Sequence, residues 1–132
     1  MIIKIGENVN VAVRGGLTGK VVDVENSKIG TVYTVEVEGY EENFIIPDYM
    51  IAKYGVGQGV MFLSSPKEKW RTQGEIKEIK YNTTTHKVEY SIQHRVIERF
   101  SSLPTPRVAV VPEDYVLEST EYKPFELIWM CD

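Results

Sequence analysis

Apolar and polar residues alternate along most of this chain with a period of two. The alternation is clearest in segments 9–13 and 33–37, where Val or Tyr occupies every second position. This pattern predicts β-strands that bury one face. Val, Ile, Thr and Tyr dominate these runs, and such side chains suit a pleated, half-buried surface. No stretch of ten residues has a convincing amphipathic period of 3.6, so the sequence predicts an all-β protein.

The strand pattern occurs twice in the chain. Four segments of the first half recur in the same order in the second half: 6–11, 19–24, 32–37 and 45–51 correspond to 57–62, 74–79, 88–92 and 110–117. The first two pairs share a glycine that precedes apolar residues. The last pair shares two β-branched residues, a proline, an acidic residue and an aromatic residue. Because the offset between the copies grows along the chain, we infer a duplication whose second copy has longer loops.

Two short segments depart from the strand pattern. Pro47 and Pro112 are each followed by acidic residues, and proline and acidic side chains both suit the first turn of a helix. We therefore expect one helical turn after each proline. Four or five short strands closed by such a turn make a small barrel. The expected fold is two small β-barrels in tandem, residues 1–54 and 55–117, packed together and followed by a tail, residues 118–132.

The tail lies outside both copies. Its segment 125–130 reads Phe-Glu-Leu-Ile-Trp-Met. We predict that this segment forms an extra strand that pairs with a barrel edge and covers it, because open edges invite aggregation. The alternative is that the apolar segment docks on another chain.

The order of glycine turns, strands, hairpin and final proline turn resembles the Src-homology-3-like barrel superfold. Within the first copy, the glycines and aliphatic residues of a KOW motif correspond to Gly6, Val9, Val11, Gly19, Val21 and Val24. The second copy is similar to a Tudor-like barrel. The resemblance implies binding of RNA, DNA or protein for KOW-containing proteins, and of modified side chains in an aromatic cage for Tudor-like barrels. No complete cage can be placed in this sequence. A small protein with this organisation also resembles phage or bacterial accessory factors that modulate a host machine.

The sequence offers little for catalysis or metal binding. His86 and His94, with one distant cysteine at position 131, do not have the spacing of zinc ligands. The adjacent carboxylates at 41–42 and 113–114 would point to opposite faces of a strand, so neither pair forms a natural acid/base couple. We expect a protein that is not an enzyme and has no catalytic residues, no cofactor and no metal site.

Composition and segment lengths bear on location. The chain is 42% hydrophobic and 26% charged, as in ordinary globular proteins. No run approaches the roughly 18 apolar residues that a membrane span needs. The first residues do not have the pattern of a signal peptide, and a single cysteine excludes an internal disulfide. We expect a cytoplasmic protein without a membrane partner.

Charge distinguishes the two copies. The formal net charge is −4, and it divides into −3 for residues 1–54, +2 for residues 55–117 and −3 for the tail. Overall acidity argues against tight nonspecific nucleic-acid binding, which depends on neutralising phosphates. A local basic patch on the second copy is still compatible with the sequence. The residues predicted to form this binding surface are Lys67, Lys69, Trp70, Arg71, Arg95 and Arg99.

Aromatic residues could contribute to binding in both copies. Trp70, flanked by cations, could stack on a base or on an aromatic side chain, but the favoured interpretation is that it anchors its loop on the barrel and that the cations are solvated. In the first copy the candidates for an aromatic platform are Tyr33, Tyr40, Phe44 and Tyr49, for which core and cross-strand packing is the favoured interpretation.

The favoured function is that of a non-catalytic binding or adaptor protein with a protein partner. The first alternative is a nucleic-acid-binding protein that uses residues 55–117. The second is a virion or assembly component that forms an oligomer through segment 125–130. The sequence does not indicate the partner or the oligomeric state.

Overall fold

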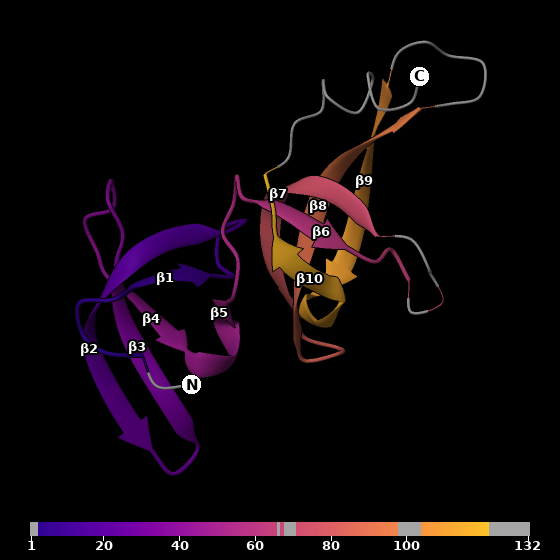
Figure 1. Cartoon of the computed structure of the whole chain (residues 1–132). Helices are drawn as coiled ribbons and strands as arrows, with labels where there is room; N and C mark the ends of the chain where they lie inside the picture. Colours follow the sequence, from indigo (N-terminus) through magenta and orange to yellow (C-terminus); the bar gives the residue numbers. More distant parts are fainter. Residues whose placement is uncertain (1–2, 66, 68–70, 98–103, 122–132) are drawn as a thin grey trace. The chain divides into compact units, whose positions relative to one another are not determined.

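The computed structural model describes residues 3–65, 67, 71–97 and 104–121, and the statements below concern these residues (Figure 1). They form two five-stranded sheets. The strands of the first sheet are β1 (Asn8–Val11), β2 (Leu17–Ser27), β3 (Gly30–Glu36), β4 (Phe44–Pro47) and β5 (Ile51–Ala52). The strands of the second sheet are β6 (Gly59–Phe62), β7 (Thr72–Asn82), β8 (Lys87–Ile97), β9 (Pro104–Pro112) and β10 (Val116–Ser119). The prediction of an all-β fold is confirmed.

The two sheets have the same connectivity. The strand order is β4-β3-β2-β1-β5 in the first sheet and β9-β8-β7-β6-β10 in the second. A 3₁₀ turn precedes the last strand of each sheet: η1 (Asp48–Met50) and η2 (Glu113–Tyr115). Pro47 and Pro112 cap these turns with nearly equal backbone angles. The helical turn expected after each proline is therefore confirmed, and the topology is consistent with two small barrels in tandem.

The chain divides into two compact units, which are described separately below. Among the described residues, unit 1 comprises residues 3–55 and the hairpin tip Ile79–Val88, and unit 2 comprises the others.

Equivalent backbone hydrogen bonds hold the first turn of each copy. The N–H of Gly6 donates to the carbonyl of Val21 at 2.8 Å, and the N–H of Gly57 donates to the carbonyl of Ile76, also at 2.8 Å. Gly6 has φ +98° and Gly57 has φ +88°, a region that residues with a Cβ rarely adopt. The glycine that opens each copy is therefore required by the turn.

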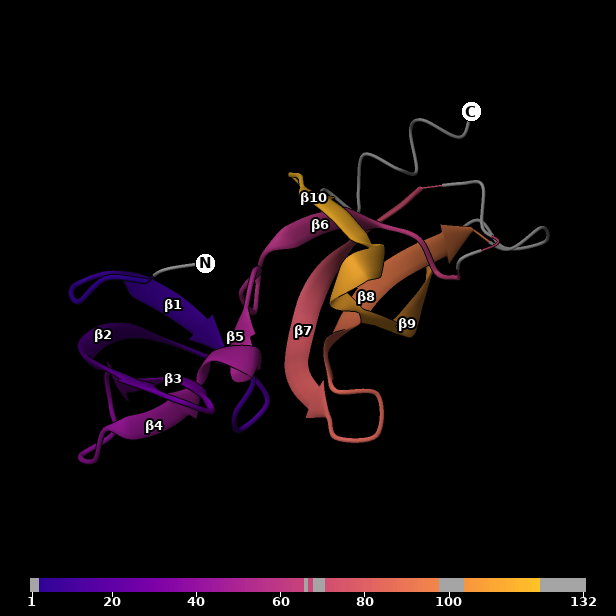
Figure 2. The ribbon, with the colours of Figure 1, turned by 90° about the horizontal axis from the view of Figure 1, so that it is seen from below.

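Each copy buries apolar residues at corresponding positions. The pairs, all 7% exposed or less, are Val9 and Val60, Val11 and Phe62, Val21 and Ile76, Tyr33 and Tyr90, Val35 and Ile92, and Ile46 and Val111. These are the inward positions of the alternating pattern. In unit 2 the long strands β7 and β8 curve strongly along their length, so that one face of the sheet encloses this core (Figure 2).

A second glycine of each copy lies where two strands come close together. A Cβ on Gly19 would lie 2.6 Å from the carbonyl oxygen of Glu36 and 2.6 Å from Cγ1 of Val35. A Cβ on Gly74 would lie 2.5 Å from Cγ2 of Ile92 and 2.7 Å from the carbonyl oxygen of Gln93. All four distances are too short for real atoms, so close packing against the neighbouring strand requires glycine at positions 19 and 74.

Two further predictions concern the C-terminal tail and membrane-spanning segments. The tail segment 125–130, for which we predicted an extra strand, lies outside the described residues. The last described strand, β10, includes the first two residues of the predicted tail. No helix among the described residues is long and apolar enough to cross a bilayer.

We predict that Gly19→Ala and Gly74→Ala each lower the free energy of unfolding by about 1–3 kcal/mol, because the added methyl group would clash with the neighbouring strand. Chemical denaturation measures the effect. Lys20→Ala, at an exposed neighbouring position of β2, is the control and should change stability by less than about 0.5 kcal/mol. Equal stability of the glycine variants and the wild type would contradict the close approach.

Candidate functional site

The structure describes three of the six residues predicted to form a binding surface, one of them by its backbone alone. Lys67 lies in an exposed turn between β6 and β7, and Arg71 is exposed immediately before β7. Arg95 lies in β8, where its backbone pairs with Pro106 of β9, and its side chain is outside the described part of the structure. The remaining candidates, Lys69, Trp70 and Arg99, are also outside it.

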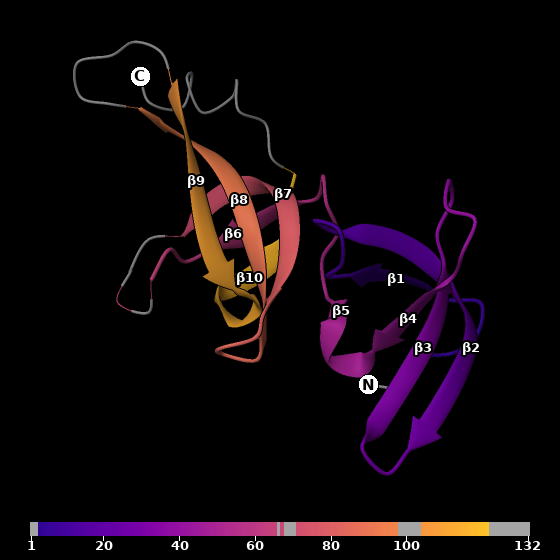
Figure 3. The same cartoon turned by 180° about the vertical axis from the view of Figure 1, so that it is seen from behind.

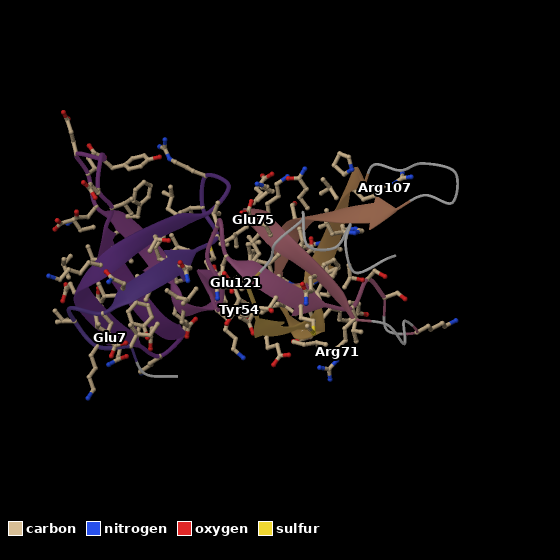
Figure 4. All side chains as sticks on the ribbon, turned by 45° about the horizontal axis from the view of Figure 1, so that its top comes forward. Glu7, Tyr54, Arg71, Glu75, Arg107 and Glu121 are labelled. Carbon is tan, nitrogen blue, oxygen red and sulfur yellow. The ribbon has the colours of Figure 1, made fainter. Side chains whose placement is uncertain are left out.

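The two described arginines of unit 2, Arg71 and Arg107, do not lie together. Nη1 of Arg71 lies 3.8 Å from Oε1 of Glu118 on β10, which offsets part of its charge locally. Arg107, which was not among the predicted residues, lies on β9. Because β10 and β9 are opposite edges of the strand order, the two arginines are separated, and they lie well apart in Figure 4. The structure therefore does not join Arg71 and Arg107 into one patch.

His94 of β8 is packed against the core and does not act as a further surface cation. Its ring contacts Phe62 edge to face, with 5.6 Å between centroids. Its Nδ1 atom is buried and has no hydrogen-bond partner among the described residues. Burial lowers the pKa of His94 below its ordinary value of 6.5, and the nearby Arg107 guanidinium lowers it further. The imidazole is therefore mainly neutral at pH 7.

We predict that His94 makes unit 2 less stable in acid. Because its folded pKa is lowered, its stabilising contribution is full above the unfolded pKa of about 6.5 and is lost as the pH falls through the folded pKa. His94→Gln should flatten the loss of stability that sets in as the pH falls below about 6.5, measured by denaturation at each pH. His86→Asn, which changes a histidine in an exposed turn, is the control. An unchanged pH dependence in His94→Gln would contradict the assignment.

The four aromatic candidates of the first copy do not form one platform. Tyr33 is 3% exposed and belongs to the core, in agreement with the favoured interpretation. Tyr49 is exposed and its ring lies 5.0 Å from that of Tyr81, in the hairpin segment that belongs to unit 1. Tyr33 and Tyr49 therefore do not face a common surface with the other two rings.

Tyr40 and Phe44 contact each other and are covered by an arginine. Their rings meet edge to face at 5.2 Å, and the Arg14 guanidinium carbon lies 5.5 Å from the Tyr40 centroid and 5.7 Å from the Phe44 centroid. Cation–π contacts of this kind stabilise exposed sites by about 0.5–1 kcal/mol. The contact joins the β1–β2 loop to the β3–β4 loop, which is a structural role.

Unit 1 also has an open, shallow hollow on the outer face of its sheet. Its volume is about 470 Å³, and its lining residues are Asn8, Thr18, Gly19, Lys20, Glu36 and Glu38. The lining is polar and contains charges of both signs. It lacks the apolar walls that bury a small ligand.

The feature of unit 2 that most clearly suggests binding is the edge strand β9. β9 pairs with β8 along nine residues, and it is the outermost strand of its sheet (Figure 3). Val108 and Val110 of this strand are 64% and 60% exposed, and they project from the same face. Exposed apolar residues on a long edge strand mark a surface that can pair with another strand.

Prolines determine which backbone groups of this edge can form hydrogen bonds. In a strand, successive residues point their N–H and C=O groups alternately toward one neighbour and the other. Pro104, Pro106 and Pro112 occupy alternate positions of β9, and proline within an edge strand faces its nitrogen away from the ladder. Val108 and Val110 are in the same register as these prolines. Their N–H groups therefore point outward, between prolines that carry no donor.

The corresponding edge of unit 1 is much shorter. β4 has four residues, and Ile45, which precedes a core residue and Pro47 as Val110 precedes Val111 and Pro112, is 65% exposed. By the same rule only Ile45 points an N–H outward in β4. The edge of β9 therefore offers two outward donors and two exposed side chains, whereas β4 offers one of each.

Sequence reasoning did not identify Val108 and Val110 as candidate binding residues. The alternate prolines of segment 104–112 were a usable signal, since proline confines a strand to an edge. Reading that signal requires the register with β8, which the sequence does not specify.

We predict that Val108→Pro is tolerated and Ala109→Pro is not. Val108→Pro removes an outward N–H and should change the free energy of unfolding by less than about 1 kcal/mol. Ala109→Pro removes an N–H that pairs with Ile92 of β8, and should cost about 2–3 kcal/mol. Denaturation of the two variants checks this. The reverse order of stability would show that the outward donors have been assigned to the wrong residues.

Comparisons with known proteins do not extend these observations. The sequence matches no known protein-family model and no curated protein. No group of three or more His, Cys, Asp or Glu side chains within the described ranges is arranged to hold a metal ion.

Proposed function

We propose that this protein is a non-catalytic binding or adaptor protein that acts through protein–protein interaction, and that its partner adds an extended segment to the edge of β9. The observation that carries this proposal is the pair of outward backbone donors at Val108 and Val110, whose side chains are also exposed. Strand addition is a common way for a sheet to recognise a peptide. Main-chain hydrogen bonds supply affinity, and alternate side chains supply specificity.

Magnitudes indicate a transient interaction. Each new backbone hydrogen bond contributes about 1 kcal/mol net, and covering the exposed part of each valine adds about 1–2 kcal/mol. Association costs about 4 kcal/mol or more in lost rigid-body freedom. With four hydrogen bonds and two covered valines, the net binding free energy is therefore only a few kcal/mol. Further contacts of the partner would have to supply the rest of a tight interaction, as suits an adaptor.

Nucleic-acid binding by the second copy is the alternative function. It needs several cations placed along one groove or face. Lys67 and Arg71 are exposed and support this alternative, but Arg71 lies beside Glu118, and Arg107 lies at the other edge of the sheet. These positions favour the protein partner over a phosphate backbone.

We predict that a photo-crosslinking residue placed at Val110 captures a protein in the native host and that the capture survives nuclease treatment. In the double variant Val108→Pro/Val110→Pro the crosslinker is placed instead at Gln93 on the neighbouring strand β8. This variant should keep its fold but lose the capture, because it lacks both outward donors. Ile45→Pro, which changes the equivalent edge of unit 1, is the matched control and should retain it. Mass spectrometry identifies the crosslinked protein and peptide.

Two results would contradict the proposed function. Equal capture by the wild type and the double proline variant would exclude the β9 edge as the binding site. Salt-dependent binding to DNA or RNA that weakens in Lys69→Ala/Arg71→Ala would instead favour the nucleic-acid alternative, because removing phosphate contacts lowers both affinity and its dependence on salt.

A further inference from the structure

Four outward residues of β9 form a pattern that reads the same in both directions. Pro106, Val108, Val110 and Pro112 turn their backbone groups away from β8, and they are symmetric about Ala109. From this symmetry we infer that β9 pairs antiparallel with the β9 strand of a second copy of this chain, across a two-fold axis at Ala109. The inference rests on the proposed function of the β9 edge and adds regulation to it, because the dimer occupies the donors that a partner would use.

The backbone groups of two such edges match one another. With the axis at Ala109, Val108 of each copy lies opposite Val110 of the other, since a two-fold axis repeats every contact. In an antiparallel pair, two opposed residues whose groups point toward each other exchange both N–H···O=C bonds. All four outward N–H groups of the two copies therefore donate to carbonyls, and four hydrogen bonds form.

The prolines determine this register. A shift of one copy by two residues would place a valine opposite Pro106 or Pro112, and proline has a ring carbon where another residue has an N–H. With the axis at Ala109, Pro106 of each copy instead lies opposite Pro112 of the other. The prolines then end the ladder on both sides, and every residue that offers a donor faces another that offers one.

Side chains beside the contact favour the same pairing. Val108 and Val110 are largely exposed and project from one face, so two copies bring four valines together. The neighbours of these valines in β8, Gln93 and Ser91, are uncharged. Arg107 lies four positions along the strand from its equivalent in the second copy, about 13 Å. This separation exceeds the screening length of about 8 Å at physiological ionic strength, so repulsion between the arginines is weak.

The small size of the contact makes the dimer reversible. Its hydrogen bonds involve two residues of each copy, whereas stable interfaces bury about 1,200–2,000 Å² in total. The edge is therefore free for a partner at low protein concentration and paired with a second copy at high concentration. Because both copies use the same patch, the contact closes at two chains and does not extend into a fibre.

Sedimentation equilibrium of the full chain tests the dimer. Between about 10 μM and 1 mM, the range of weak association, the weight-average mass should rise from that of one chain toward that of two. Val108→Pro/Val110→Pro should remain monomeric, because it removes all four donors. Ile45→Pro, which changes the equivalent edge of unit 1, is the matched control and should associate as the wild type does.

Cysteine substitution tests the register in chains that retain their donors. Val108→Cys and Val110→Cys, both in a Cys131→Ser background, are mixed with one of them isotopically labelled. Positions 108 and 110 of opposite copies should lie about 5.5 Å apart between Cα atoms, whereas the same position in two copies should be about 7–8 Å apart. Because a disulfide spans roughly 4.4–6.8 Å, the mixed disulfide should exceed either symmetric one about tenfold on mild oxidation.

Three results would overturn the inference. A wild-type chain that stays monomeric up to about 1 mM would show that β9 does not pair with itself. Self-association that persists in Val108→Pro/Val110→Pro would place the contact elsewhere on the molecule. Symmetric disulfides as abundant as the mixed one would exclude a two-fold axis at Ala109.

Partner capture distinguishes failure of this inference from failure of the proposed function. If the chain is monomeric at every concentration but Val108→Pro/Val110→Pro abolishes capture, the edge binds a partner and only the self-pairing is wrong. If the chain dimerises but this variant captures the partner unchanged, the edge is a dimer contact and the proposed function is wrong. If both are right, the dimer linked by the mixed disulfide, probed from the Gln93 crosslinker, should lose the capture, and reduction of the disulfide should restore it.

Discussion

Backbone hydrogen bonding at the edge strands of the two sheets is the constraint on which this structure depends. An open sheet of five strands always leaves two strands with one unpaired side, and unpaired donors and acceptors invite further pairing. In unit 1 the exposed edges are short, with four residues in β4 and two in β5. In unit 2 one edge, β9, is nine residues long. Three prolines remove donors from most of that edge, and the two donors that they leave are the basis of the proposed binding surface.

The duplication explains both the common scaffold and the place where the copies differ. Four kinds of residue occupy equivalent positions in the two copies, because the same barrel geometry requires them twice. They are the turn glycines, the glycines packed closely against a neighbouring strand, the core residues and the proline before each 3₁₀ turn. The longer hairpin β8–β9 has no such requirement. Its extension beyond the core positions that the two copies share lengthens the edge, so the second copy gains a surface that the first copy lacks without any change in topology.

The sequence predicted the features that depend on local periodicity and failed where the register between strands decides the outcome. Alternation predicted strands, and the prolines at 47 and 112 predicted the helical turns, because both signals act within a few residues. The close packing of Gly19 and Gly74 could not be predicted, because it depends on which residues of the neighbouring strand lie beside each glycine. The same holds for Val108, whose outward N–H follows only from its place in register with Pro106. Charge suggested a basic surface, but the structure places the Arg71 side chain beside Glu118 of the edge strand β10 and Arg107 on the opposite edge strand β9, which composition alone cannot reveal.

The prolines of β9 also limit how strongly any strand can pair with this edge. Val108 and Val110 are the only residues of β9 that point an N–H outward, so an added strand receives few main-chain hydrogen bonds, each worth about 1 kcal/mol net. A partner that contributes one additional contact of about 1.4 kcal/mol therefore binds tenfold more tightly than a strand that pairs through the backbone alone. The prolines thus limit unspecific strand pairing and leave recognition to the side chains of the partner.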